Sequence, residues 1–441
     1  MSATELVALV SCDLGAIVRG RSVFAAELEE HLASGIGWVP ANQALTPLGP
    51  LAEPNPFGST GDLRLLPDAA THVRVGADPG HSPLELVLCD IVDTDGRPWD
   101  CCPRTFLRDA LAALSQRTGA SVRASFEHEF QLRRGGEPAP LPFSLQAMRA
   151  AEPFGGELMG ALVEAGTEPE RFFAEFASHQ FEVPVAPAGG LEAADRAVVL
   201  REVVRELARR EGVRATFTPL LDPAEAGNGV HIHISLHAED GRALLYDPQR
   251  PGGLSELGGS FAAGVLAHAP ALCALCAPSP VSGERLRPHH WSAGAVSLGL
   301  RNRETLLRIP PLVGAGGAEA QSQMRLEYRG ADAAANPYLA LGAILRAGLD
   351  GIAAELPAPA ILQEDPARLG KADAERFGVG ALPVSIDEAL SALEADSEAR
   401  AWLGAPNGLL FEAYVSLKRA ELGLVADMEL QERCERYAEV Y

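Results

Sequence analysis

The stretch Val230-His-Ile-His-Ile-Ser-Leu236 alternates polar and aliphatic residues from end to end. In a β-strand, successive side chains point to opposite faces, so His231, His233 and Ser235 share one face and the aliphatic residues share the other. Two histidines at this spacing are typical of contact with a metal ion or a phosphate, and Gly227-Asn-Gly229 just upstream lets backbone or ligand approach closely. Two surface histidines with satisfied hydrogen bonds are the alternative.

A second stretch, Phe126-Glu-His-Glu-Phe-Gln-Leu132, has the same period of two. It places Glu127, Glu129 and Gln131 on one face. At about 3.3 Å per residue, the stems of the two carboxylates stand roughly 6.6 Å apart, a separation that suits two neighbouring cations better than one shared ion. An ordinary solvated strand face is the alternative interpretation of this motif alone.

Further acids occur downstream, at Glu175 and in Gln180-Phe-Glu-Val183. In Arg325-Leu-Glu-Tyr-Arg329, alternation aligns two arginines with one glutamate, and Arg301-Asn-Arg303 and Arg308 add three guanidinium groups. Together the motifs predict a pocket with five acids, a histidine and several arginines. Phosphoryl transfer needs such a pocket, because divalent cations neutralise polyphosphate oxygens and arginines stabilise the charge that develops on the transferred group. The chain has no Gly-x-x-x-x-Gly-Lys-Ser/Thr loop, so a P-loop nucleotide site is excluded.

Composition narrows the classes of partner. The 441 residues are 47% hydrophobic and 22% charged, which is typical of a folded globular protein. A net charge of -22 opposes broad contact with nucleic acids or anionic membranes. No run of about 18 apolar residues and no signal-peptide pattern occurs, so we expect a cytoplasmic protein. Among seven cysteines, Cys273 and Cys276 have the spacing of a metal or redox pair, but their apolar, helical context predicts packed, reduced thiols.

The chain divides near Cys102-Pro103. Residues 1–100 contain short β-like runs separated by turn signals, which predict a small sheet-rich domain. From 101 to 441, long helical periods alternate with strands, as in 104–116 followed by 122–132, and predict a larger domain. A clear amphipathic helix is expected from about Leu191 to Glu211, with Gly212 as its stop.

The order and spacing of these motifs resemble the glutamine synthetase family. The resemblance runs over almost the whole chain, through Cys102-Pro-Arg104, Glu127-His-Glu129, Glu175 with Gln180-Phe-Glu182, Gly227-Asn-Gly-Val-His-Ile-His233, Arg301-Asn-Arg303, Arg308-Ile-Pro310, Arg325-Leu-Glu-Tyr-Arg329 and Ala335-Asn-Pro-Tyr-Leu339. It implies an α+β fold with a small N-terminal β-grasp domain (1–100) and a large catalytic domain (101–441) whose curved sheet forms a partial barrel. It also implies a homo-oligomer, a dodecamer of two stacked hexamers with active sites shared between neighbouring subunits.

The resemblance also implies roles for individual residues. Glu129, Glu175 and Glu182 match the ligands of one Mg²⁺ or Mn²⁺ ion, and Glu127, His231 and Glu327 match those of a second. Positions near ATP are matched by His233, Ser235, Arg303, Arg308 and Arg325. Positions that bind the acid substrate or act on the transferring phosphoryl group are matched by Gly227, Arg285, Arg303 and Arg329. The implied reaction activates the γ-carboxylate of glutamate as an acyl phosphate, which an amine then attacks.

Two departures concern the amine. The family's ammonia-using members carry a lid like Arg-Leu-Val-Pro-Gly-Tyr-Glu, whose glutamate takes a proton from ammonium, whereas this chain reads Arg285-Leu-Arg-Pro-His-His-Trp291. The aspartate those members place beside ammonium has no match in Trp38-Val-Pro-Ala-Asn-Gln43. A site without these acids should hold ammonium poorly. Trp291 would instead present an aromatic wall to a larger amine, with His289 or His290 as base. Variable lid residues, with Trp291 packed against a neighbouring subunit, are the alternative.

Other departures concern the acid substrate and regulation. Ala226 stands where ammonia-using members have an asparagine that contacts glutamate, which fits the organic-amine branch but leaves the acid substrate open. The segment Asp365-Pro-Ala-Arg-Leu-Gly370 lacks the tyrosine-bearing loop used for adenylylation in some bacterial members. We therefore expect that form of control to be absent.

The sequence thus favours an ATP-dependent γ-glutamyl-amine ligase acting on glutamate and an alkylamine, ethanolamine, polyamine or arylamine. Polyamines call for acids near the amine entrance, and Trp291 favours a less polar amine. Glutamine synthesis from ammonium is an alternative that needs another lid acid, for which Glu284 is the nearest candidate. A non-catalytic sensor or structural relative is a third possibility, although it has no chemical reason to bury six metal-ligand groups. A metal-dependent hydrolase would not explain the arginines.

Overall fold

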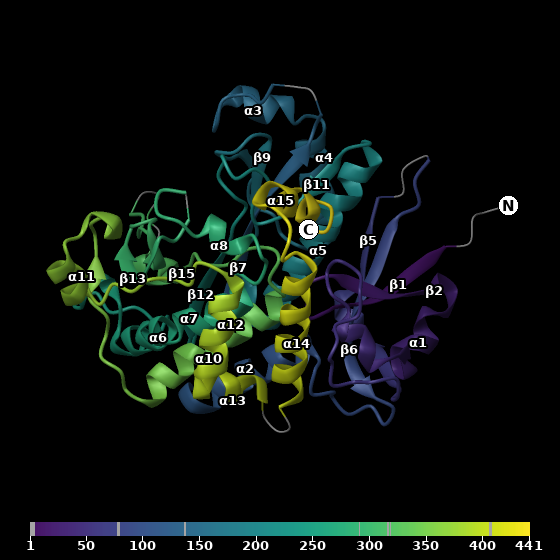
Figure 1. Cartoon of the computed structure of the whole chain (residues 1–441), viewed down its shortest axis with the longest axis horizontal. Coiled ribbons are helices and arrows are strands. Elements are labelled where there is room, and N and C mark those ends of the chain that lie inside the picture. The colour runs from purple at the N-terminus through teal and green to yellow at the C-terminus, as the bar shows by residue number, and fades with distance from the viewer. Residues whose placement is uncertain are drawn as a thin grey trace.

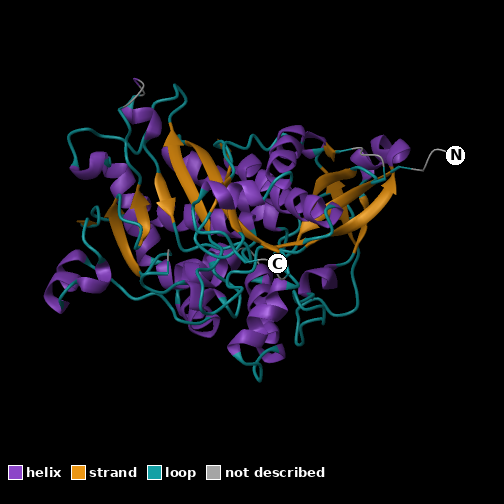
Figure 2. Cartoon of the chain, turned by 90° about the horizontal axis from the view of Figure 1, so that it is seen from above, coloured by secondary structure: helices purple, strands orange, loops and turns teal. Residues whose placement is uncertain are grey.

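The computed structural model describes residues 5–76, 80–135, 138–290, 292–314, 317, 319–404 and 408–441. Two β-sheets organise the chain. The first hundred residues build a six-stranded sheet at one side of the molecule, and a ten-stranded sheet with most of the helices fills the rest (Figure 1). Figure 2 shows the strands of the two sheets as separate groups with helices between and around them.

The N-terminal sheet has the order β2-β1-β6-β4-β3, with β5 on β6. Its one short α-helix among the described residues is α1 (Leu28–Ser34). One face of the sheet has a small core of its own, while the other merges with the main core. The strand bounds are β1 (Leu6–Cys12), β2 (Val18–Phe24), β3 (Ile36–Trp38), β4 (Leu63–Pro67), β5 (Val73–Val75) and β6 (Leu84–Asp93).

The larger sheet has the order β16-β13-β14-β15-β12-β7-β9-β8, and β10 and β11 also pair with β7. It curls into a partial barrel, as the family resemblance implied. The long central strand β7 pairs with β12 on one side and β9 on the other. The strand bounds are β7 (Ser121–Arg133), β8 (Phe173–Ala174), β9 (Gln180–Pro184), β10 (Ala188–Gly189), β11 (Arg214–Thr216), β12 (Val230–His237), β13 (Ala295–Leu300), β14 (Thr305–Ile309), β15 (Leu326–Tyr328) and β16 (Ile361–Leu362).

Helices pack around the large sheet and between it and the N-terminal sheet. The predicted amphipathic helix is α5 (Gly190–Arg210), and Gly212 beyond its end has a φ of 72°. The other helices are α2 (Pro103–Thr118), α3 (Leu145–Ala150), α4 (Phe154–Glu164), α6 (Glu256–Ala267), α7 (Ala269–Cys276), α8 (Ser282–Arg285), α9 (Ala320–Gln323), α10 (Pro337–Ala353), α11 (Lys371–Phe377), α12 (Ile386–Ala395), α13 (Ser397–Gly404), α14 (Leu409–Leu424) and α15 (Leu430–Ala438).

The predicted apolar helix around the two close cysteines is broken in two. α6 and α7 meet at a 74° bend at His268, and Cys273 and Cys276 lie buried and reduced on α7. Burial raises the pKa of the Cys273 thiol to about 12, so it stays protonated and unreactive. No single described helix is long and apolar enough to cross a membrane, and this bent pair passes that test only by length and composition.

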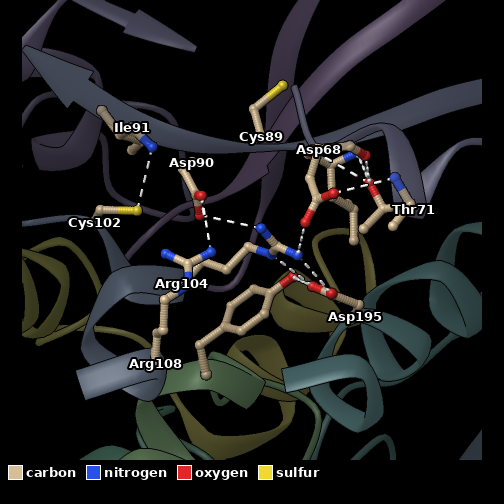
Figure 3. Close-up of polar contacts among 12 residues, drawn as sticks. Asp68, Thr71, Cys89, Asp90, Ile91, Cys102, Arg104, Arg108 and Asp195 are labelled. Carbon is tan, nitrogen blue, oxygen red and sulfur yellow. Dashed lines mark hydrogen bonds and ion pairs between the residues drawn. The ribbon is translucent and has the colours of Figure 1, made fainter. Parts of the chain in front are cut away.

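A buried arginine joins the N-terminal sheet to the helices of the larger part. Arg104, at the start of α2, donates two hydrogen bonds of 2.9 Å to the carboxylate of Asp195 on α5. It also reaches Asp90 on β6 at 3.2 Å and Asp68 after β4 at 2.7 Å (Figure 3). The hydroxyl of Tyr338 on α10 donates to the same Asp195. The Arg104 guanidinium group therefore connects two carboxylates on or beside the N-terminal sheet with one carboxylate of α5.

Candidate active site

Polar side chains from five neighbouring strands form a continuous row across the large sheet. The row runs through β9, β7, β12, β15 and β14. In register, Glu182 lies opposite Glu129, and Glu127 lies opposite His231. Further along, His233 and Arg308 lie opposite Glu327 from its two sides. The period-two prediction for these strands is confirmed, and strand register brings their charged faces together.

Three carboxylates gather at the β7–β9 end of the row. Glu129 faces Glu182 across the two strands, and Glu175 follows β8, which pairs with β9. Burial, together with repulsion from Glu129, raises the pKa of Glu175 to about 7. Burial and the neighbouring Glu127, Glu129 and Glu175 raise the pKa of Glu182 well above its usual range. Like charges placed opposite each other are destabilising unless a proton or a cation lies between them.

A second group lies one strand further along. Glu127, His233 and Glu327 each offer a ligand atom, and these atoms lie within 4.8 Å of one another. His233 Nε2 is 3.0 Å from Glu127 Oε1, and His231 Nδ1 is 3.5 Å from Glu127 Oε2. Burial alone would raise the pKa of Glu127, but the two histidines hold it well below its usual range. The family resemblance implied His231 as a ligand in this group, and its ring also lies beside Glu127.

Both groups fit divalent cations. Carboxylate oxygens and imidazole nitrogens are the donors that Mg²⁺ and Mn²⁺ accept. His231 Nε2 is buried without a hydrogen-bond partner among the described residues. Burial, together with the positive Arg329, lowers the pKa of His231, which therefore stays neutral with a free lone pair. A bound cation would accept the lone pair of His231 Nε2 and would remove the repulsion among the carboxylates.

Arginines surround these two groups of acids and histidines. Arg308 and Arg329 each donate to a different oxygen of Glu327, Arg308 at 2.6 Å. Burial alone would raise the pKa of Glu327, but His233 and Arg329 lower it to about 2. Arg325 Nε donates to His233 Nδ1 at 3.1 Å, which fixes the tautomer of that ring. Arg303 is exposed on the turn between β13 and β14, and its carbonyl accepts from Arg329.

The glycine loop before β12 packs on a buried arginine. A Cβ atom on Gly227 would lie 2.1 Å from Pro219 O and 2.7 Å from Arg285 Cγ, so only glycine fits there. Arg285 is fully buried, donates to Ala331 O at 2.8 Å and lies 4.0 Å from Asp332. Among the described residues, Gly227 and Arg329 line the cavity that also contains Glu129 and Glu182, whereas Arg285 does not line it and lies behind the loop.

Two adjoining cavities open along the row. One of about 550 Å³ is lined by both groups of acids and histidines, with Arg303, Arg308, Arg325 and Arg329. The other, of about 780 Å³, is lined by Ser235 and by polar residues of β7 and β12. They share five residues, Glu127, Arg171, Pro184, His233 and Arg325. The two cavities therefore adjoin along the row of polar side chains.

The segment predicted as a lid is only partly described. Trp291 lies outside the described residues. His290 donates its backbone N–H to Arg287 O, and neither His289 nor His290 is among the described residues that line the cavity. His289, with a φ of 66°, is held by its ring at 2.9 Å from Asp365 and by its N–H at 3.0 Å from Glu304. The assignment of His290 as base stays a prediction.

Two residues that support the site had no role assigned from sequence. Gln180 Nε2 contacts Glu129 at 3.3 Å, Gly227 O at 2.9 Å and Asn228 Oδ1 at 2.9 Å. Asn228 in turn donates to Gln131 and to Thr218 O. This amide network fixes the glycine loop relative to Glu129. Alternation did place Gln131 on the same face as Glu127 and Glu129, but an uncharged amide gives no sequence signal of its function.

Comparison with known proteins places the chain in a family. A model of the glutamine synthetase N-terminal domain matches residues 1–99, and a model of the glutamine synthetase catalytic domain matches residues 100–437. A γ-glutamylpolyamine synthetase, GlnA3 of Streptomyces coelicolor, is 35% identical over 96% of this chain and 91% of its own. A glutamine synthetase of Pyrococcus horikoshii is 30% identical over 95% of this chain and 89% of its own.

Solved structures of similar fold point to the same family as the domain models and the relatives. A crystal structure described as a novel glutamine synthase homolog has 48% identity and a TM-score of 0.92, covering 100% of this chain and 99% of its own. A structure of GmaS without ligand has 27% identity and a TM-score of 0.82, covering 98% and 96%. The domain models, the relatives and the shared architecture agree, and the chain belongs to the glutamine synthetase family.

Proposed function

We propose that the protein is an ATP-dependent ligase that joins the γ-carboxylate of glutamate to an organic amine through a γ-glutamyl phosphate. The observation that carries this proposal is the single row of carboxylates, histidines and arginines in one cavity. Membership of the glutamine synthetase family supports the ligase class. The similarity to a protein named γ-glutamylpolyamine synthetase supports the organic-amine branch.

The donors on β7, β9, β12 and β15 would hold two divalent cations. Glu129, Glu175 and Glu182 form one donor set, and Glu127, His231 and Glu327 form the other, with Nε2 of His231, which has no hydrogen-bond partner among the described residues, as its nitrogen donor. When bound, Mg²⁺ or Mn²⁺ would neutralise the phosphate oxygens of ATP and polarise its γ-phosphorus. His233, Ser235 and Arg325 would bind the nucleotide from the side of the larger cavity.

In the first step, an oxygen of the glutamate γ-carboxylate attacks the γ-phosphorus of ATP and ADP leaves. Arg303, Arg308 and Arg329 line the space where this charge develops, and they would stabilise it. Gly227 lines the space where the acid substrate would bind, and Arg285 packs against that loop from behind. In the second step, the amine nitrogen attacks the acyl carbon, phosphate leaves, and a base accepts the amine proton. His290 of the lid is the candidate base.

The lid composition supports an organic amine over ammonium. The sequence carries Trp291 where ammonia-using members have an acid, and it carries Ala226, which lines the cavity and leaves more space than asparagine would. We propose that Trp291 contacts the amine. Trp291→Glu is expected to increase kcat/KM for ammonium at least tenfold relative to that for the best organic amine. If the ratio of kcat/KM for ammonium to that for the organic amine stays unchanged, Trp291 does not determine amine specificity.

We also propose that the working form is a homo-oligomer, a double ring of two hexamers, by likeness to the family. Light scattering during size-exclusion chromatography would test this, with a mass near twelve times 46.5 kDa expected. A monomeric mass with full activity would contradict it.

The function is tested by phosphate release from ATP with Mg²⁺ and glutamate, across ammonium, methylamine, ethanolamine, putrescine, spermine and aniline, with mass detection of the amide. Product with one organic amine and little with ammonium is the expected result. Strong activity with ammonium alone would show a glutamine synthetase. ATP binding without any product, under conditions in which hydroxylamine also fails to trap an acyl phosphate, would indicate a non-catalytic relative.

A further inference from the structure

Two phenylalanines stand exposed at the edge of the cavity that contains the cation-binding groups. Phe143 and Phe176 both line it, with 49% and 41% of their surfaces exposed. Their ring centroids are 6.4 Å apart and the rings are tilted by 47°. Phe173 and Ala226 line the same cavity. Adjacent exposed aromatic rings at a concave site are typical of a surface that binds an apolar part of a ligand.

The rings are held in place by the structure around them. Phe176 directly follows Glu175, and the turn after it is fixed by hydrogen bonds from Ala177 N to Gln180 Oε1 and from Ser178 N to Glu225. Phe143 has a φ of 55°, a conformation that bulky side chains rarely adopt. Such a conformation persists only where the surroundings impose it, which is common at ligand sites.

The charges around this aromatic wall define what it would bind. Among the described residues, the carboxylates that line the cavity are Glu127, Glu129, Glu175, Glu182 and Glu327, all in the proposed cation-binding groups. The other charged residues that line it, among those described, are Arg171, Arg303, Arg308, Arg325 and Arg329. With the five carboxylates engaged by the proposed cations, the charged groups left in this cavity are guanidinium groups, which repel a second ammonium group.

We infer that Phe143 and Phe176 bind the carbon body of the amine substrate, and that this substrate is a primary monoamine with an extended alkyl or aryl body. The inference rests on the proposed ligase function. The amino group would lie toward the acyl phosphate, and the carbon chain would lie on the two rings. Each buried methylene group improves binding about fourfold, so a six-carbon amine gains a large advantage over methylamine or ammonium.

The test compares hexylamine with 1,6-diaminohexane, which has the same carbon chain and one more charge, and with methylamine. For the intact protein, kcat/KM is expected to be at least tenfold higher for hexylamine than for methylamine, and higher for hexylamine than for the diamine. Phe143→Ala and Phe176→Ala are each expected to raise KM for hexylamine about tenfold, with KM for glutamate and ATP within twofold of the original.

Phe24→Ala is the matched control, because Phe24 is 50% exposed and lies on β2, outside the described lining of this cavity. It is expected to leave every KM unchanged. Phe143→Leu and Phe176→Leu keep apolar bulk, and they are expected to recover at least half of the lost affinity. They also serve as the test if an alanine variant does not fold.

Three outcomes would overturn the inference. The first is an unchanged KM for hexylamine in the variants of both phenylalanines. The second is a lower assembly mass of the Phe143 and Phe176 variants while their KM for hexylamine stays unchanged. That result would show that the two rings form a contact between subunits. The third is a higher kcat/KM for the diamine than for hexylamine. The proposed ligase function fails separately, if the intact protein forms no γ-glutamyl hydroxamate from ATP, glutamate and hydroxylamine, because that small nucleophile does not need the wall.

Discussion

Glu129 on β7 and Glu182 on β9 lie directly opposite each other in strand register, with their carboxylates on the same face of the sheet. Two buried acids in this position repel each other, and Glu175 adds a third carboxylate nearby. A structural role does not explain such an arrangement, because it lowers stability. Binding of a divalent cation explains it, since the cation converts the repulsion into attraction.

Replacing one of the opposed acids should separate stability from function. Glu182→Gln removes a charge from the buried cluster while keeping the side-chain shape. We expect the metal-free protein to gain about 1 kcal/mol or more in free energy of unfolding at pH 8, and ligase activity to fall at least a hundredfold. Denaturant unfolding with EDTA and a steady-state assay would measure the two. A loss of stability in the variant would contradict the proposed cation site.

The acid cluster also predicts how stability depends on pH. Burial and Glu129 raise the pKa of Glu175 from 4.5 to about 7 in the folded, metal-free protein. The unfolded chain releases this proton near pH 4.5, so the contribution of this group to stability is present below that pH and is lost as the pH rises through 7. Mg²⁺ binds the deprotonated cluster. The rise in Tm caused by Mg²⁺ should therefore be larger at pH 8 than at pH 5.5, and an equal or smaller rise at pH 8 would contradict the assignment.

The glycine loop predicts a sharp steric effect. Gly227→Ala would place a Cβ atom 2.1 Å from Pro219 O, which cannot move without breaking its hydrogen bond from Asn228 N. We expect a loss of about 1–3 kcal/mol in stability and loss of activity, because Gln180 and Arg285 both contact this loop. Gly160→Ala on α4 is the matched control. A Cβ atom there meets no atom within 4 Å, and the change should stabilise the protein by up to about 1 kcal/mol.

The link between the two sheets can be tested with two neighbouring arginines. Arg104 is 3% exposed, and its removal would leave Asp195 buried without its cation, at a cost of about 3–5 kcal/mol. Arg108 is half exposed and pairs only with Asp90 among the described residues. Arg108→Ala should therefore cost about 0–1 kcal/mol. Equal losses in the two variants would show that Arg104 does not hold the N-terminal sheet in place.

Much of the site was predictable because strand alternation determines which residues share a face. Glu127 and Glu129, His231 and His233, and Arg325 with Glu327 all face the cavity as their spacing predicted. Alternation within one strand does not determine register between strands. Register places His231 opposite Glu127 and His233 opposite Glu327, and neither pairing can be read from one strand alone.

Other features depend on segments without periodicity. Arg285 was predicted beside the substrate, but its depth behind the glycine loop depends on close packing against Gly227 and Gly229, which no pattern in the sequence encodes. Phe143 and Phe176 lie 33 positions apart in irregular segments and meet only in the folded protein. The continuous helix expected around Cys273 is divided at His268, where Pro270 cannot donate the hydrogen bond that a continuing helix needs.

The central claim is that glutamate is activated as an acyl phosphate. The most direct measurement uses glutamate labelled with ¹⁸O in its γ-carboxylate, together with ATP, Mg²⁺ and hexylamine, and detects the label in the released phosphate by mass spectrometry. Attack of the carboxylate on ATP followed by amide formation transfers one labelled oxygen per phosphate released. We predict one ¹⁸O in each phosphate, equal in amount to the amide. Phosphate released without label would show hydrolysis of ATP by water and would contradict the account.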